Sequence, residues 1–225
     1  MKRIIALISL PLIFVLIGCD TGSSQDDTPP TGPIVCFGDS LTEGYGAGGL
    51  GAVDRSRSYP AFLQRKVAPE VVNAGISGDT AADGLVRVER DVLSRNPQMV
   101  IIFLGANDFL QRRPAAETKA DLQAIINRIR DGERKIFLVS FLGDLNWEAN
   151  LTNSLAGVIF TQHGDLLSEY RRMFDELVSE NNGLGFIPDI WTGVWGINMS
   201  DPIHPNAAGY EIIAETIFNA IRPNL

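Results

Sequence analysis

IVCFGDSLTEGYG, residues 34–46, is the stretch of sequence that most constrains the fold. Four apolar residues are followed at once by Gly38, Asp39 and Ser40, and then by a glycine-rich polar loop. A continuous apolar run of this kind is typical of a strand that is covered on both faces. Its abrupt end is either an ordinary turn, since these residue types favour turns, or a strand end that presents Ser40 as a nucleophile.

Similar apolar runs recur along the chain and alternate with helical patterns. Strands are predicted at residues 34–37, 71–74, 99–104, 136–141 and 184–187. Apolar residues spaced three or four apart predict helices around residues 59–67, 85–93, 122–129, 167–178 and 213–221. Alternating strands and helices are joined by right-handed crossovers, which place the strands parallel in one sheet. We therefore predict an α/β fold, a single three-layer α/β/α domain with a five-stranded parallel sheet.

The N-terminal segment is predicted to lie outside this domain. Lys2 and Arg3 precede an apolar run at residues 4–17, which is too short to span a bilayer and is typical of a signal peptide. The run ends in LIGC, which resembles the lipobox of bacterial lipoproteins and implies cleavage before a lipidated Cys19. An ordinary secretory signal followed by a chance cysteine is the alternative.

The predicted organisation has three parts: a lipoprotein signal peptide at residues 1–18, a flexible polar tether at residues 19–32 and a folded domain at residues 33–225. We expect export to the bacterial cell envelope and attachment to the periplasmic side of a membrane through the lipid anchor. With Cys19 lipidated, Cys36 is the only remaining cysteine, so no disulfide is available within the domain.

Charge and histidine content argue against several classes of partner. The net charge is −8, and it becomes −10 once Lys2 and Arg3 leave with the signal peptide. No basic run is present, so a nucleic-acid partner is not expected. Two histidines and one free cysteine, without an H-E-x-x-H motif, do not provide a typical zinc site. We expect no metal and no cofactor, and a monomer that acts on a small molecule.

The residues that follow the predicted strands are where chemistry is expected, because ligands of open parallel sheets bind beyond the carboxyl ends of the strands. These residues are Gly38-Asp39-Ser40, residues 75–78 (GISG), residues 105–108 (GAND) and, before the last helix, residues 201–204 (DPIH). A glycine directly after three of the strands permits close approach of the backbone and leaves amide groups facing a ligand.

Only one of the two histidines has a partner arranged for catalysis. Asp201 lies three residues before His204, so its carboxylate can accept the Nδ1–H and leave Nε2 to accept a serine proton. Asp201 can also cap a helix over residues 204–221, and the sequence leaves both roles open. His163 is predicted to be a surface or packing residue. The G-x-S-x-G elbow is absent, since Thr42 replaces its second glycine.

Four blocks in this order resemble the GDSL or SGNH hydrolase family. They are GDSL at residues 38–41, Gly75 within NAGISGDT, GAND at residues 105–108 and DPIH at residues 201–204. The bacterial branch of thioesterase I, lysophospholipase L1 and arylesterase is the most similar part of that family. The resemblance covers nearly the whole mature chain and implies the flavodoxin-like SGNH fold, in agreement with the predicted sheet.

The resemblance also assigns roles by position. It implies that Ser40 is the nucleophile, that His204 is the general base and that Asp201 orients this base. The oxyanion hole would consist of the backbone N–H groups of Ser40 and Gly75 and of the side-chain amide of Asn107.

Other residues of these blocks are expected to support the site rather than to react. Asp39 and Asp108 are predicted to hold their turns through backbone hydrogen bonds. Thr80 and Asp83 have the spacing of a capping box. Pro202 departs from this branch of the family, in which glycine is frequent at that position, and removes a backbone donor.

The implied function is that of a serine esterase for short to medium acyl or aryl esters, with thioesters and lysophospholipids as further candidates. Residues 143–161, with Trp147, and residues 190–199, with Trp191 and Trp195, are expected to hold exposed aromatic side chains that line the substrate pocket, stack on sugars or simply pack. A carbohydrate O-deacetylase of the same fold and a non-catalytic binding lipoprotein are the alternatives.

Overall fold

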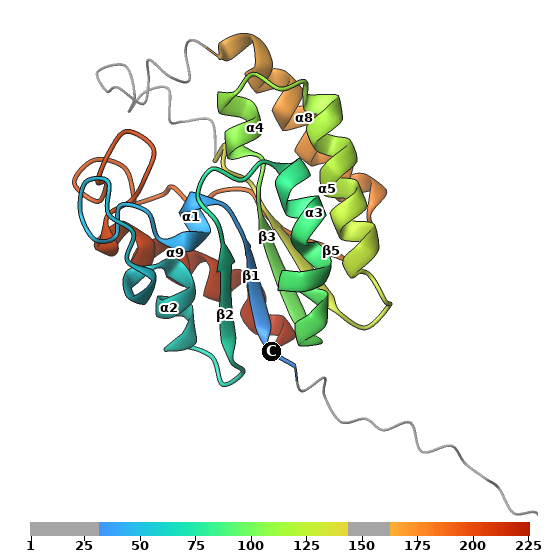
Figure 1. Cartoon of the computed structure of the whole chain (residues 1–225), viewed down its shortest axis with the longest axis horizontal. Coiled ribbons are helices and arrows are strands. Elements are labelled where there is room, and N and C mark those ends of the chain that lie inside the picture. Colours follow the sequence, from blue (N-terminus) through green and yellow to red (C-terminus); the bar gives the residue numbers. More distant parts are fainter. Residues whose placement is uncertain (1–31, 144–162) are drawn as a thin grey trace, which may run out of the picture.

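The apolar runs form a parallel sheet at the centre of the structure (Figure 1). The computed structural model describes residues 32–143 and 163–225, so the predicted signal peptide, Cys19 and Trp147 lie outside the described residues. The sheet has five strands in the order β2-β1-β3-β4-β5, all pairs of which are parallel. Their bounds are β1 Ile34–Gly38, β2 Val71–Gly75, β3 Met99–Phe103, β4 Lys135–Val139 and β5 Leu184–Ile187.

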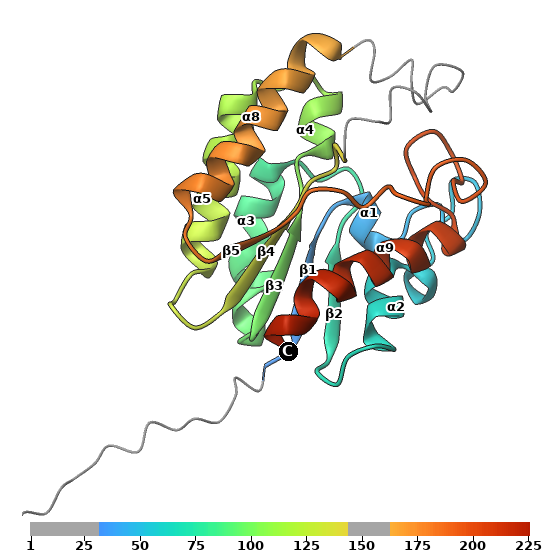
Figure 2. The same ribbon diagram turned by 180° about the vertical axis from the view of Figure 1, so that it is seen from behind.

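Helices cover both faces of this sheet, which confirms the predicted three-layer architecture (Figures 1 and 2). One face carries α3 (Ala81–Asp91), α5 (Ala115–Ile129) and α8 (Gly164–Glu180), and the other carries α2 (Tyr59–Gln64) and α9 (Ala207–Ile221). Two short helices, α1 (Ser40–Glu43) and α4 (Ala106–Leu110), follow β1 and β3 directly. Among the described residues, the other helical turns are of the 3-10 type, at Arg55–Arg57, Leu93–Arg95 and Arg222–Asn224.

The central strands β1 and β3 are buried along their whole length, as their continuous apolar sequence predicts. Burying a single Ile or Val side chain contributes about 1.5–3 kcal/mol to stability, so these strands anchor the fold. Cys36 lies within β1 and is fully buried. This burial raises the pKa of its thiol to about 12, although a hydrogen bond with Tyr59 lowers the pKa slightly. None of the described helices is long and apolar enough to cross a membrane.

Several predicted boundaries are wrong, among them the following three. The strand predicted over residues 136–141 ends at Val139, because the Ser140 hydroxyl accepts the Leu142 N–H and turns the chain. The helix predicted over residues 59–67 ends at Gln64. The last helix begins at Ala207, and its cap is Asn206, which accepts the Gly209 N–H at 3.1 Å. Asp201 is therefore not the cap of this helix.

The strand order creates a crevice at the carboxyl ends of β1 and β3. From β1 the chain passes through α2, on one face, to β2, whereas from the neighbouring β3 it passes through α5, on the opposite face, to β4. Connections that leave neighbouring strands for opposite faces open a gap between them, which is where ligands of such sheets bind. Ser40, at the start of α1, and Asn107, in α4, both lie beside this crevice.

Candidate active site

Ser40 is the first residue of α1, and the turn before it is tightly packed. The Asp39 side chain caps this helix by accepting the Leu41 N–H at 3.0 Å, which confirms its predicted structural role. At Gly38, an added Cβ would lie 2.5 Å from the Phe103 carbonyl oxygen, so only glycine fits between β1 and β3. The backbone therefore fixes Ser40 at the end of the sheet, where its side chain is partly exposed.

Asp201 and His204 form a self-contained loop. Asp201 Oδ2 lies 2.7 Å from His204 Nδ1. Its other oxygen, Oδ1, accepts the backbone N–H groups of Ile203 at 2.9 Å and His204 at 2.8 Å. Neither bond needs an N–H at position 202, so Pro202 costs the loop no donor.

The structure brings the three predicted catalytic residues together. Ser40 and His204 are 164 positions apart in sequence, yet His204 Nε2 lies 3.0 Å from Ser40 Oγ. Because an ionised carboxylate only accepts, Nδ1 of a neutral imidazole must carry the proton here and Nε2 must be the acceptor. The Ser40 hydroxyl is thus placed to donate to Nε2.

His163 lies elsewhere, as predicted for a packing residue. It is the residue before α8, and its Nε2 lies 3.2 Å from the Leu110 carbonyl oxygen. Its ring packs on Phe109, with 5.2 Å between the ring centroids.

Asn107 presents its side-chain amide to the same crevice. Its Nδ2 donates to the Asp79 carbonyl oxygen at 2.9 Å and lies 3.5 Å from Asp39 Oδ2. Both neighbours are acceptors, so the nitrogen rather than the oxygen of the amide must face them. Only the bond to Asp79 is short, and the second amide proton is available to a negatively charged ligand atom.

Gly75 is the one predicted site residue that the structure does not place at the site. Its N–H donates to Asn73 Oδ1 at 3.0 Å, and its carbonyl accepts from Arg55 Nη2 at 2.9 Å. A Cβ at this position would lie 2.2 Å from the Glu43 nitrogen, so glycine is required for packing of β2 against α1. The prediction that the Gly75 N–H lines an oxyanion hole is wrong, because Asn73 already binds that group.

Gly78, three residues later, is a candidate donor that the sequence pattern did not single out. Its φ of +88° favours glycine, and an added Cβ would meet nothing within 4 Å. Its neighbours are both bound: the Ser77 N–H donates to Glu43 at 2.9 Å, and the Asp79 carbonyl accepts from Asn107. Within residues 32–143 and 163–225, the Gly78 N–H has no acceptor. The second glycine of NAGISGDT was the available signal.

Two buried carboxyl groups stabilise this end of the sheet. Burial raises the pKa of Asp39 to about 7; the Leu41 N–H lowers this pKa, and the nearby Asp79 and Asp108 carboxylates raise it. Asp108 Oδ2 accepts the Ala81 N–H at 2.8 Å and Oδ1 accepts from Arg113 at 2.8 Å, which confirms its structural role.

An apolar pocket opens beside Ser40, His204 and Asn107. Its volume is about 460 Å³, with the solvent space at its mouth included. The lining includes Leu41, Phe109, Phe141, Trp191, Trp195 and Ile203. Among its described lining residues, His204 is the only titratable side chain apart from the Ser40 hydroxyl.

The two described tryptophans form one wall of this pocket. Trp191 and Trp195 stack with 4.5 Å between ring centroids. Trp191 is buried rather than exposed, and its Nε1 donates to the Phe141 carbonyl at 2.7 Å. The part of the chain that the structure describes contains no group of three or more His, Cys, Asp or Glu that could hold a metal ion.

A parallel sheet with a serine, a histidine and an aspartate in hydrogen-bond contact beyond its strands is the arrangement of a serine hydrolase with a three-layer α/β/α fold. A sequence model of the GDSL-like lipase/acylhydrolase family matches residues 36–212. The chain therefore belongs to this family, which confirms the family resemblance and the expectation of a hydrolase.

The chain is similar to two esterases and, over about half of its length, to a lipoprotein. Esterase TesA of Pseudomonas aeruginosa is 27% identical over 197 residues, which cover 85% of this chain and 89% of the relative. A crystal structure of TesA superposes with a TM-score of 0.68 at 24% identity, over 86% of this chain and 99% of that chain. An acetylxylan esterase of Geobacillus stearothermophilus is 25% identical over 84% of this chain and 93% of the relative. The lipoprotein YqeF of Bacillus subtilis is 34% identical over 48% of this chain and 41% of the relative.

Proposed function

We propose that the protein is a serine esterase that works through an acyl-enzyme intermediate. The observation that carries this proposal is the chain of contacts from Ser40 Oγ to His204 Nε2 and from His204 Nδ1 to Asp201. Ser40 attacks the ester carbonyl while His204 takes its proton, and His204 then protonates the leaving alcohol. Water that is activated by His204 cleaves the acyl-enzyme and regenerates Ser40.

The negative charge that forms on the carbonyl oxygen is stabilised by three donors: the N–H groups of Ser40 and Gly78 and the Nδ2 of Asn107. Within the described ranges, no acceptor is bound to either backbone N–H. Such preorganised donors are typically the largest single contribution to acyl transfer. Gly78 replaces Gly75 in this set.

The substrates are short to medium acyl or aryl esters. A pocket without a described acidic or basic lining residue other than His204 favours an uncharged acyl or aromatic group. Stacked Trp191 and Trp195 give this group a flat aromatic wall. Thioesters and lysophospholipids with acyl groups of similar size are further substrates within the same mechanism.

Two measurements on the mature chain test this function. A fluorophosphonate probe should label Ser40, and Ser40→Ala should remove both the label and the hydrolysis of p-nitrophenyl esters from acetyl to decanoyl. Activity should extend beyond acetyl, with the longest acyl chains disfavoured. Absence of label and of turnover would instead identify a non-catalytic binding lipoprotein.

A carbohydrate O-deacetylase is the second candidate, and the acetylxylan esterase relative is the observation that favours it. The tryptophans would then stack on sugar rings. Strict preference for acetyl esters, together with release of acetate from acetylated xylan, would establish this alternative over the first.

We also propose that the chain is a lipoprotein with a signal peptide at residues 1–18, a lipidated Cys19 and a tether up to residue 32. The lipoprotein relative supports this proposal. Strand β1 begins at the end of the sheet opposite α1, the helix whose first residue is Ser40 (Figure 1). Cys19→Ala should move the protein from the membrane to the soluble fraction of bacterial cells and abolish labelling with a fatty-acid probe.

A further inference from the structure

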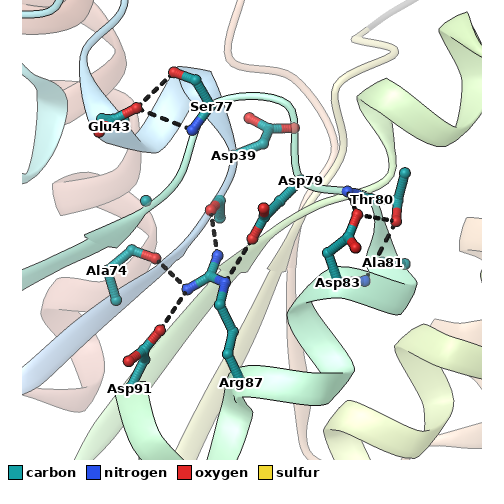
Figure 3. Close-up of polar contacts among 12 residues, drawn as sticks. Asp39, Glu43, Ala74, Ser77, Asp79, Thr80, Ala81, Asp83, Arg87 and Asp91 are labelled. Atoms are coloured by element: carbon teal, nitrogen blue, oxygen red, sulfur yellow. Dashed lines mark hydrogen bonds and ion pairs between the residues drawn. The ribbon is translucent and has the colours of Figure 1, made fainter.

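The loop at residues 75–80, which we call the Gly78 loop, is held at both ends by side chains from other elements (Figure 3). Figure 3 shows Glu43 on the Ser77 side of this loop and Arg87 on the Asp79 side. Gly78 lies between these two contacts and is the only residue of the loop whose φ is positive. A glycine with φ in this region has many accessible conformations, so its orientation depends on how its neighbours are held.

Glu43 holds the Ser77 side with two hydrogen bonds to a single carboxylate oxygen. Glu43 Oε2 accepts the backbone N–H of Ser77 at 2.9 Å and its hydroxyl at 2.6 Å. Glu43 is the last residue of α1, the helix that begins at Ser40. One side chain therefore ties the peptide next to Gly78 to the helix that carries the nucleophile.

The other carboxylate oxygen of Glu43 is also bound. Oε1 accepts from Arg55 Nη2 at 2.6 Å, and the same Nη2 donates to the Gly75 carbonyl at 2.9 Å. Burial acts to raise the pKa of Glu43, but the bonds from Ser77 and Arg55 outweigh it and hold the pKa below its ordinary value. Glu43 is thus a carboxylate at neutral pH, and only 18% of its side chain is exposed.

The Asp79 side of the loop is held by Arg87 from α3. Arg87 Nε donates to Asp79 Oδ2 at 2.5 Å, and Nη2 donates to the Gly38 carbonyl at 2.8 Å. Arg87 is buried and stacks on Phe37, so it is part of the core and its removal would disturb the fold. Glu43 is partly exposed and reaches the loop from α1, which makes it the contact that can be tested separately.

We propose that Glu43 is a positioning residue for the oxyanion hole: through Ser77 it sets the orientation of the Gly78 N–H relative to Ser40. This inference rests on the proposed esterase function. The negative charge of a tetrahedral intermediate must meet donors at about 2.7–3.1 Å, and a displacement of about 1 Å can cost 10²-fold in rate. Glu43 does not touch the substrate; it fixes the distance between two of the three donors.

The test is a kinetic comparison of Glu43→Ala with Glu176→Ala in the mature chain. Glu176 also forms an ion pair, with Lys119 at 2.8 Å, but lies on α8. We expect Glu43→Ala to lower kcat about 10- to 10²-fold with little change in KM, and to weaken a boronic-acid transition-state analogue by a similar factor. Glu43→Gln keeps an acceptor for Ser77 and should be intermediate. Glu176→Ala should match the wild type.

A double-mutant cycle separates positioning from general stability. Ser77→Ala should lower kcat in the wild-type background but not in Glu43→Ala, because the bond that it removes is already lost there. If Glu43→Ala does not fold, the same cycle is run with Glu43→Leu, which fills similar space but cannot accept a hydrogen bond from Ser77. Additive losses, a fall in thermal stability at unchanged kcat, or a rise in KM alone would overturn the inference. A wild-type protein that hydrolyses no ester and is not labelled at Ser40 would overturn the proposed function instead.

Discussion

The loop that carries His204 and the loop that carries Gly78 are held in opposite ways. Residues 200–206 are fixed by their own side chains, since Asp201 binds the backbone of Ile203 and both the backbone and the ring of His204. The Gly78 loop is fixed by side chains from three other elements: Arg87 in the following helix α3, and Glu43 in α1 and Asn107 in α4, which are 34 and 28 positions away from their partners in the loop. A substitution of His204 in the first loop therefore removes the general base. Most substitutions around the Gly78 loop instead leave the Gly78 N–H in place and change its position.

The largest expected effect lies in the first loop. His204→Ala should lower kcat roughly 10⁴-fold or more, because no other base is in contact with Ser40 Oγ within the described residues. His163→Ala is the matched control and should leave steady-state ester hydrolysis unchanged. Comparable losses in both variants would contradict the assignment of the base.

Asp39 is fully buried next to Ser40, and its substitution should change how stability depends on pH. Its folded pKa of about 7 lies above the ordinary value of 3.8, so the folded state binds more protons between these limits. The free energy of unfolding should therefore fall as the pH rises from about 4 to 7, by on the order of 4 kcal/mol from this group.

Chemical denaturation at several pH values compares wild type with Asp39→Asn, which keeps an acceptor for the Leu41 N–H. We expect the difference between the two stabilities to shift in favour of the variant as the pH rises. Parallel stability curves from pH 4 to 7 would mean that Asp39 does not titrate in this range.

Asn107→Ala tests the second loop from the α4 side. The variant loses an oxyanion donor and the bond that holds the Asp79 carbonyl. We expect kcat to fall roughly 10²–10³-fold, because removal of one such donor typically has that effect. A rate equal to the wild type would show that Asn107 does not contact the developing charge.

The smallest effects distinguish the two glycines of the second loop. Gly75→Ala should lower the free energy of unfolding by about 1–3 kcal/mol, because its Cβ would lie 2.2 Å from the Glu43 nitrogen. Gly78→Ala meets no neighbour within 4 Å and should cost about 1–2 kcal/mol from its positive φ alone. We expect Gly75→Ala to have the lower melting temperature of the two variants and Gly78→Ala to have the lower kcat. If Gly75→Ala has the lower kcat and Gly78→Ala the lower melting temperature, Gly75 rather than Gly78 belongs to the oxyanion hole.

The contrast between a loop fixed by its own residues and a loop fixed by other elements also explains which features could be predicted from the sequence. The sheet followed from apolar runs such as residues 99–104, and the Asp201–His204 pair followed from a spacing of three residues, because both are local patterns. The error at Gly75 has a tertiary cause. Whether its N–H is free depends on the Asn73 side chain, whose own amide is bound by the Thr42 carbonyl at 2.8 Å. No pattern in the sequence identifies Glu43 as the partner of Ser77.

The interior position of Cys36 has a practical consequence for chemical labelling. A thiol that ionises only near pH 12 supplies almost no thiolate at neutral pH, and the strand around it excludes reagents. Maleimides and similar compounds would therefore leave it untouched. In a domain that begins after Cys19, a single cysteine introduced on the surface would become the sole conjugation point, so that the domain could be attached to a bead or a dye in one defined orientation.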